Sequence, residues 1–532
     1  MGEFVEIYDS TLRDGAQAEG IAFSSEDKLL IARRLDELGV HYIEGGWPNP
    51  TNPKDLAFFR EVKKLGLRAQ VTAFGSTRRA NNPPNEDATL HTLLQAETET
   101  VCVFGKSWTL HVEAALKTTR EKNLELIEDS VGFLTDRGRK AVYDAEHFFD
   151  GYKDDPAYAI ETLKAAQRGG AQILVLCETN GGALPSEVAE IIKATIEEID
   201  IPFGIHAHND AGMAVANTIA AVELGAIQVQ GTFNGLGERC GNANLCTVIP
   251  NLELKMKRIT IGANHLTELM DFSRFLNDIA NVYHDHRQPF VGESAFAHKG
   301  GVHIDAMSKH PRCYEQCDPE LVGNERRFLV SDQSGSSTVV SKLDRVFPGL
   351  NKKDPRVAAI LEEVKRLENQ GYQFEAAEGS FELLARRAMG SYQDLFELVS
   401  FRTIIRNASD DDASEAIVKV VVDDQVYHTV GEGDGPVNAL DRALRKALEQ
   451  EFPSIRQVHL EDYKVRVLSS TDGTAARVRV LIESSDGRNV WGTVGASENV
   501  IEASWIALAD SLHYKLMKDA TQVEELHQKR VS

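Results

Sequence analysis

The chain has 532 residues, of which 42% are hydrophobic and 26% charged, a balance typical of folded soluble proteins, and this length predicts two to four domains. Its 81 acidic and 58 basic residues give a formal net charge of −23, which disfavours binding to nucleic acid or to an anionic membrane surface. No signal region or membrane-spanning apolar run is evident and the six cysteines are scattered, so we expect a cytoplasmic protein with reduced thiols.

Up to about residue 258, strand-like and helix-like segments alternate with little interruption. Amphipathic stretches such as Glu26–Leu38 and Ala157–Gln167 separate the predicted strands. Eight strand–helix units in roughly 250 residues predict an α/β fold of the (β/α)8 TIM-barrel type, with a doubly wound sheet as the alternative. The predicted strands are Phe4–Asp9, Tyr42–Gly46, Arg68–Phe74, Thr100–Phe104, Lys140–Tyr143, Ile173–Cys177, Phe203–His206 and Ile227–Gly231.

Clusters of polar residues lie at or just after the carboxyl ends of six of these strands. In a barrel, those ends converge on one face, where active sites are built. The sequence therefore predicts a single active site formed by polar residues from segments that are far apart in the chain. The clusters are Asp9–Gln17, Glu44–Pro48, Glu146, Glu178–Gly182, His206–Asp210 and Asn234–Asn242.

The most specific cluster contains His206 and His208. Side chains at positions i and i+2 of a strand share a face, so both imidazoles can reach one ion. A lone histidine would be explained as a satisfied core residue. Two histidines with Asp14 upstream instead supply two imidazoles and a carboxylate, a set that binds a divalent metal and leaves positions open for substrate.

Residues 259–395 are predicted to form a lid and helical linker, with an unusual insert at Pro289–Val322 and a charged helical stretch from residue 352 to 390. Cys313 and Cys317 in this region could hold a metal, but a structural role is the better interpretation.

From residue 396 to 520 a weak repeat predicts a C-terminal α+β domain, and residues 521–532 a polar tail. Each half has a strand pair that ends in Thr-Val-Gly and leads into a helix. The glycine-rich run Gly431–Gly435 lacks the spacing of a dinucleotide site. Loops entering helix N-termini could hold a carboxylate effector, with a plain dimerisation module as the alternative. The strand pairs are Ala416–Val422 with Gln425–Val430, and Ala476–Glu483 with Asn489–Val494.

Three motifs resemble the 2-isopropylmalate/homocitrate/citramalate synthase family. They are Leu12-Arg13-Asp14-Gly15-Ala16-Gln17 followed by Lys28, Phe203–Gly212, and Gly235–Ala243. The resemblance extends from about residue 4 to 518. It implies an acyltransferase that joins acetyl-CoA to a 2-oxo acid on a metal-bearing TIM barrel. The implied ligands of a divalent ion (Zn, Mn, Co or Mg) are Asp14, His206, His208 and Asn242.

The same resemblance implies roles for further residues. Arg13 would stabilise the charge that develops on the substrate oxygen, and Glu146 would take a proton from the acetyl group. His303 and Tyr314, in the insert, would assist hydrolysis of the thioester. The insert of relatives reaches the partner subunit, so a homodimer is implied. The candidate substrate-binding residues are Arg13, Gln17, Glu44, Tyr143 and Thr179.

The identity of the 2-oxo acid depends on the size of the pocket. Trp47, Phe104 and Tyr143 are expected near the site and would leave room for a methyl group. The segment Glu368–Glu378 resembles the branch of the family that uses pyruvate. We therefore predict pyruvate and a place in isoleucine biosynthesis, with 2-oxoisovalerate and 2-oxoglutarate as alternatives. The resemblance of the C-terminal domain to the family's regulatory domain implies an amino-acid effector, expected to be isoleucine.

Other classes fit the sequence less well. A hydroxymethylglutaryl-CoA lyase would carry a Gly-Gly-Cys-Pro loop where this chain has Gly-Glu-Arg-Cys-Gly. A biotin-dependent carboxyltransferase would carry an Ala-Met-Lys-Met motif, which is absent. A catalytically inactive effector-binding protein is disfavoured by the intact Arg13, Asp14, Glu146, His206 and His208.

Overall fold

The computed structural model describes residues 3–49, 53–405, 414–468 and 473–531. The chain divides into two compact units, Met1–Phe296 with Cys317–Arg326, and Ala297–Gln316 with Arg327–Ser532. The predicted boundary at residue 258 thus falls inside the first unit, and the insert Pro289–Val322 is divided between the two. Among the described helices, none has both the length and the apolar composition needed to cross a membrane.

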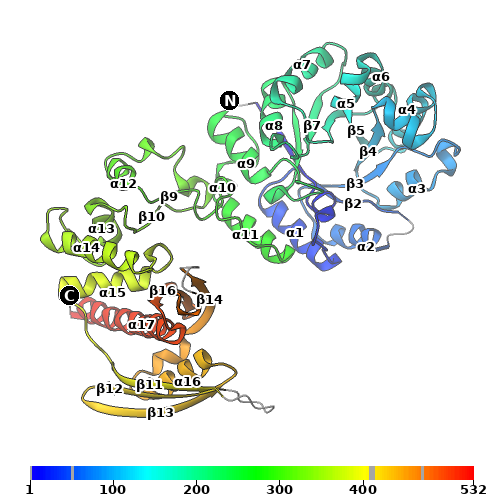
Figure 1. Ribbon diagram of the computed structural model, residues 1–532. Coiled ribbons are helices and arrows are strands. Elements are labelled where there is room, and N and C mark those ends of the chain that lie inside the picture. Colours follow the sequence, from blue (N-terminus) through cyan, green and yellow to red (C-terminus); the bar gives the residue numbers. More distant parts are fainter. Residues whose placement is uncertain (1–2, 50–52, 406–413, 469–472, 532) are drawn as a thin grey trace. The chain divides into compact units, whose positions relative to one another are not determined.

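A closed parallel barrel of eight strands forms the core of the first unit (Figure 1). The strands follow chain order around the barrel, and β8 closes it against β1. This confirms the predicted TIM barrel and excludes the doubly wound sheet. The strands are β1 (Glu6–Asp9), β2 (Tyr42–Gly46), β3 (Gln70–Ser76), β4 (Thr100–Lys106), β5 (Lys140–Glu146), β6 (Ile173–Glu178), β7 (Phe203–Ala207) and β8 (Gln228–Gly231).

Helices connect successive strands and cover the outside of the barrel. In the first of them, Ser24 and Asp27 form a reciprocal capping box, and Ile31 and Leu35 are fully buried on the inner face. The helices of this unit are α1 (Ser25–Glu37), α2 (Pro53–Val62), α3 (Ala88–Gln95), α4 (Arg120–Thr135), α5 (Phe148–Asp154), α6 (Pro156–Arg168), α7 (Pro185–Ile196), α8 (Ala214–Glu223), α9 (Leu245–Pro250), α10 (Ala263–Leu266) and α11 (Leu269–Ala280).

Strand side chains alternate between the barrel interior and the layer beneath the helices. On β5, Val142 packs in the interior with Tyr8 and Cys102, whereas Tyr143 and Ala145 pack in the outer layer. Successive strand residues must face opposite sides. The polar residues Asp144 and Glu146 therefore share the interior face with Val142.

The second unit begins with a small two-stranded parallel sheet and a group of helices. Strand β9 (Ala297–His298) pairs with β10 (Arg327–Phe328). The charged stretch predicted to be helical forms α14 (Pro355–Asn369) and α15 (Glu378–Met389). The remaining helices here are α12 (Gly301–Met307) and α13 (Ser336–Leu343).

The C-terminal part consists of two halves, each with a three-stranded antiparallel sheet and one helix. The repeat was predicted, but with two strands in each half. The leading strands β11 and β14 were missed because most of their side chains are exposed and give no regular apolar alternation. The halves are β11 (Glu397–Ile405), β12 (Ser414–Val422), β13 (Gln425–Gly433) and α16 (Pro436–Leu448), then β14 (His459–Val467), β15 (Val478–Ser485), β16 (Val490–Ser497) and α17 (Val500–Val531).

Two further expectations for this region change. Helix α17 runs to Val531, so residues 521–531 continue a helix in place of the predicted separate tail. Gly431 belongs to β13, and a Cβ there would lie 2.5 Å from the backbone nitrogen of Ala443 on α16. The glycine therefore allows close packing of helix on strand, consistent with rejecting a dinucleotide site.

Candidate active site

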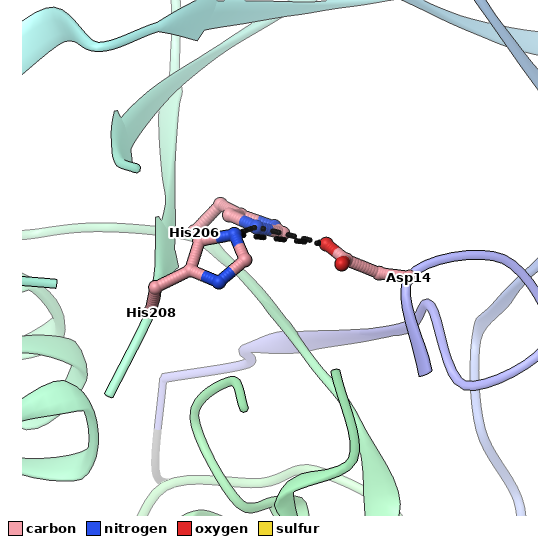
Figure 2. A group of neighbouring side chains, drawn as sticks. All are labelled: Asp14, His206 and His208. Carbon is pink, nitrogen blue, oxygen red and sulfur yellow. Dashed lines mark hydrogen bonds and ion pairs between the residues drawn. The ribbon is translucent and has the colours of Figure 1, made fainter. Parts of the chain in front are cut away.

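Asp14, His206 and His208 converge at the carboxyl end of the barrel strands (Figure 2). Asp14 follows β1, His206 lies in β7, and His208 comes just after β7. Nε2 of His206 is 3.3 Å from Oδ2 of Asp14, Nε2 of His208 is 3.9 Å from the same oxygen, and the two nitrogens are 3.4 Å apart. All three side chains are buried. Over the described ranges, this is the group of His, Cys, Asp or Glu ligands that converges closely enough to hold a metal.

Asn242, the fourth predicted ligand, lies beside His208. An isolated β-bridge joins it to His208, and its Nδ2 donates to the carbonyl of Leu236 at 3.1 Å. Its Oδ1 is buried and has no hydrogen-bond partner among the described residues. A buried amide oxygen without a partner costs free energy that a cation ligated there would recover. The donor set therefore fits a divalent metal.

The protonation states of Asp14 and His208 also suit a metal. The charge of Arg13 and the contact with His206 hold the pKa of Asp14 well below its usual range, although burial opposes this. Burial and the neighbouring His206 lower the pKa of His208 to about 4. At neutral pH, Asp14 is thus an anion and His208 a neutral imidazole, which are the forms that coordinate metal.

Arg13 is held rigidly beside these ligands. Its Nε donates to Oε1 of Glu44, and its Nη1 lies 3.2 Å from Oδ2 of Asp14. Glu44 is fully buried and also accepts a hydrogen bond of 2.6 Å from the hydroxyl of Tyr8. Glu44 was predicted to bind substrate, but it does not line the cavity. Its carboxylate instead holds the Arg13 guanidinium in place.

A cavity of about 190 Å³ opens over the metal-ligand group. It brings together seven predicted residues, namely Arg13, Asp14, Gln17, Glu146, Thr179, His206 and His208, and both Trp47 and Phe104. The other lining residues, none of which was individually predicted, are Phe74, Asp144, Cys177, Glu238 and Arg239.

Tyr143 is, after Glu44, the second predicted substrate residue that does not line the cavity. Its side chain is fully buried in the outer layer of the barrel, and Asp144 lines the cavity in its place. Strand alternation could have revealed this, because Glu146 and Asp144 share a face that Tyr143 cannot share.

The aromatic side of the cavity is built from Trp47, Phe74 and Phe104, which we name the aromatic wall. The rings of Phe74 and Phe104 stack with centroids 5.2 Å apart. Trp47 meets Phe104 edge-on at 5.3 Å and Phe74 at 5.8 Å. All three rings line the same cavity as Asp14, His206 and His208.

Glu146 and Thr179 lie at neighbouring strand ends. Glu146 forms an ion pair with Lys106, the last residue of β4. The hydroxyl of Thr179 accepts a hydrogen bond of 2.9 Å from the backbone nitrogen of His147, and a hydroxyl that accepts one bond can still donate another. Nη2 of Arg239 donates to the carbonyl of Thr179 at 2.7 Å. The cavity thus contains a carboxylate, a hydroxyl and cations in fixed positions.

His303 and Tyr314 belong to the second unit, where they form a pair of their own. Their rings stack with centroids 3.9 Å apart at an angle of 18°. Nearby in the sequence, Nε2 of His298 lies 3.3 Å from Oε1 of Glu315, and both side chains are buried. The structure therefore brings the two predicted hydrolytic residues together with each other.

Comparison with family models divides the chain into three parts. Residues 4–276 match the HMGL-like model, residues 290–372 match the homocitrate synthase post-HMGL domain-like model, and residues 375–516 match the LeuA allosteric (dimerisation) domain.

Curated relatives are similar over almost the whole chain. The (R)-citramalate synthase of Geobacter sulfurreducens is 54% identical over 97% of this chain and 98% of its own length. The (R)-citramalate synthase of Aquifex aeolicus is 52% identical over 98% and 99%. A probable 2-isopropylmalate synthase of Methanopyrus kandleri is more distant, at 32% identity over 95% and 97%.

Proposed function

The chain belongs to the (R)-citramalate synthase family, and we propose that it condenses acetyl-CoA with pyruvate and hydrolyses the thioester to give (R)-citramalate and CoA. It is an enzyme of the acyltransferase type. The observation that carries the proposal is the agreement between full-length similarity to these synthases and a cavity that combines metal ligands, an arginine and a carboxylate. The reaction is the first step of a pyruvate route to isoleucine.

Asp14, His206, His208 and Asn242 would hold one divalent ion. Their oxygen and imidazole donors suit Zn, Mn, Co or Mg. When bound, the ion supplies Lewis acidity that polarises the keto group of the 2-oxo acid.

Arg13 stabilises the negative charge that develops on the keto oxygen of pyruvate as the new carbon–carbon bond forms. Its guanidinium is fixed by Glu44 before substrate binds, so no reorganisation is needed during the reaction. Gln17 and Thr179 line the same cavity and can hydrogen-bond the substrate carboxylate.

Glu146 removes a proton from the methyl group of acetyl-CoA. The C–H electron pair then attacks the keto carbon, and the proton moves to a carboxylate oxygen of Glu146. Lys106 contacts this carboxylate and fixes its position at the end of β5. His303 and Tyr314, contributed by the partner subunit of a homodimer, assist the later hydrolysis of the thioester.

Pyruvate is favoured over larger 2-oxo acids by the aromatic wall, because three bulky rings share a small cavity with the metal ligands. A distal carboxylate, as in 2-oxoglutarate, would need a further cation. Within the described lining the cations are Arg13 and Arg239, and Arg239 already pairs with Asp210 at 2.7 Å. The similarity to 2-isopropylmalate synthases is also lower than that to the citramalate synthases.

The C-terminal domain is proposed to bind isoleucine and to join two subunits. The match to a LeuA allosteric (dimerisation) domain supports a dimer. The loops after Thr429–Gly431 and Thr493–Gly495 lead into α16 and α17, whose N-termini favour carboxylate binding. All six cysteines lie in described ranges and carry free thiols, which supports the proposed cytoplasmic location.

Release of free CoA tests the proposed reaction. The purified protein is assayed with acetyl-CoA and each of pyruvate, 2-oxoisovalerate and 2-oxoglutarate, with and without EDTA and with and without isoleucine. We expect release with pyruvate that the chelator abolishes and isoleucine reduces. Preference for 2-oxoisovalerate would overturn the substrate, unchanged kinetics with isoleucine would overturn the effector, and no release would overturn the reaction.

A further inference from the structure

A line of buried polar side chains crosses the barrel interior behind His206. Nδ1 of His206 lies 3.0 Å from Oε1 of Gln230, and Nε2 of Gln230 donates to Oδ1 of Asp144 at 3.0 Å. Gln230 is fully buried on β8, in register with His206 on β7. Asp144, on β5, also accepts a hydrogen bond from the thiol of Cys102. Side chains from three other strands, β8, β5 and β4, therefore support this imidazole on β7.

Asp144 decides which way the amide of Gln230 points. Burial raises the pKa of Asp144, whereas His206 and its hydrogen bonds lower it, but its oxygen accepts from an amide in either protonation state. The NH2 group of Gln230 therefore faces Asp144, and its carbonyl oxygen faces His206. A reversed amide would place one acceptor against another at an ionised Asp144.

The direction of that amide favours the tautomer of His206 that binds a metal. The carbonyl oxygen of Gln230 accepts a proton held on Nδ1, which leaves Nε2, the nitrogen that faces Asp14 and His208, free to offer its lone pair to an ion. Outer hydrogen bonds of this kind orient metal-ligating histidines and raise their affinity.

His208 provides a contrast within the same site. Its Nδ1 is buried and has no hydrogen-bond partner in the part of the chain that the structure describes. The two imidazoles are thus supported differently. The line of buried polar side chains in the barrel interior contacts His206 and not His208.

We propose that Gln230 is a positioning residue that transmits the orientation set by Asp144 to His206 and so presets Nε2 for the metal. This inference rests on the proposed metal site and adds to it a support that lies in the barrel core. Neither Gln230 nor Asp144 is among the proposed metal ligands.

The test measures Mn²⁺ binding by the full-length protein without substrate, from the free-ion EPR signal. Gln230→Met keeps the length of the side chain but cannot accept from Nδ1 or donate to Asp144. Asp144→Asn allows the amide of Gln230 to reverse. We expect each substitution to weaken Mn²⁺ binding by about 10- to 100-fold, the range found when a hydrogen-bond partner of a metal-ligating side chain is removed.

The double variant separates a relay from two independent effects. If Asp144 acts through Gln230, adding Asp144→Asn to Gln230→Met should weaken binding little further. Additive losses would overturn the relay. If Gln230→Met does not fold, Asp144→Asn alone decides, because a folded variant with wild-type Mn²⁺ affinity contradicts the proposal.

Gln228→Met is the matched control. Gln228 is fully buried two residues earlier on β8 and donates to Glu6 at 3.1 Å, away from His206, so Mn²⁺ affinity should be unchanged.

His208→Ala tests the metal site itself. Failure of the wild type to bind Mn²⁺, or wild-type affinity in His208→Ala, overturns the site. Loss in His208→Ala with none in Gln230→Met overturns only the relay.

Discussion

The guanidinium carbon of Arg13 lies 3.8 Å from the centroid of the Phe74 ring. The cation thus covers part of the aromatic wall while its Nε donates to Glu44. A cation over an aromatic face is stabilised most where water is excluded, as it is here. Arg13 therefore links the aromatic wall, proposed to select the substrate, to the stabilisation of charge on the substrate. Separate variants can test these two roles.

Arg13→Lys should lower kcat by about 10²- to 10³-fold, the cost of removing one donor to a developing oxyanion. Lysine keeps the charge but cannot donate to Glu44 and face the substrate at the same time. Release of CoA at saturating substrates measures the effect. Arg366→Lys, which replaces an arginine paired with Glu363 on the exposed side of α14, should leave kcat unchanged. A wild-type kcat in Arg13→Lys would contradict the role of the guanidinium.

Phe74→Leu and Phe104→Leu should each widen the cavity at the aromatic wall. The ratio of kcat/KM for 2-oxoisovalerate to that for pyruvate should rise by about 10-fold or more, as expected when space for extra methyl groups is created in an apolar pocket. Using the ratio cancels any general loss caused by moving Arg13. Phe133→Leu, which changes a buried ring in the outer layer, is the control and should leave the ratio unchanged. An unchanged ratio in both wall variants would mean that the aromatic wall does not select the substrate.

Glu146→Gln should lower kcat by about 10²- to 10⁴-fold, because an amide cannot take the proton from the acetyl methyl group. Mn²⁺ affinity should remain that of the wild type, since Glu146 is not among the converging ligands. Glu121→Gln, on the exposed side of α4, serves as the control. Normal turnover in Glu146→Gln would exclude this residue as the base.

Asp510→Asn should change how stability depends on pH. Burial raises the pKa of Asp510 to about 6, although a hydrogen bond from Ser380 and the charge of Arg387 oppose the rise. Between about pH 4 and pH 6 the folded state therefore holds a proton that the unfolded state has lost, so wild-type stability falls as pH rises through this window. The asparagine variant should lack that fall, measured as the free energy of unfolding in urea at each pH.

Asp486→Asn provides the opposite case to Asp510→Asn. Burial opposes charge on Asp486, but the hydrogen bond from Lys515 and its ionic contact hold the pKa of this carboxyl below its usual range. The charged Asp486 carboxylate stabilises the folded state above the pKa that this group has in the unfolded chain, and this stabilisation is lost as pH falls. The free energy of unfolding of the variant should therefore differ from that of the wild type mainly at higher pH. If the free energy of unfolding of Asp510→Asn and that of the wild type changed with pH in the same way, the raised pKa of Asp510 would be contradicted.

Mixed dimers test whether the second unit acts on the partner's barrel. Glu146→Gln and His303→Ala homodimers should both be impaired in overall turnover. With random mixing, about half of the dimers are mixed and each contains one intact composite site, so about a quarter of wild-type activity should return. No recovery on mixing would indicate that each His303 serves its own barrel, or that no dimer exchange occurs; native mass spectrometry of the mixture distinguishes these outcomes.

Local sequence patterns determined the barrel and much of the site. The alternation of strand and helix, and the spacing of His206 and His208, depend on neighbours only a few residues away. A strand's periodicity fixes which side chains share a face, and parallel strands bring their carboxyl ends together. The eight strands and the convergence of Asp14 with the two histidines followed from these rules.

Other features depended on tertiary closure. The contact of Gln230 with His206 spans 24 residues of sequence, and its contact with Asp144 spans 86. No local period encodes such a partner, because it arises only when the barrel closes. The same closure turned Glu44 into an anchor for Arg13. The sequence by itself determined the metal-ligating groups and most of the predicted polar groups of the site. The tertiary structure decided which residues touch the substrate space and which hold the others in place, because side-chain partners across a barrel depend on packing and not on sequence distance.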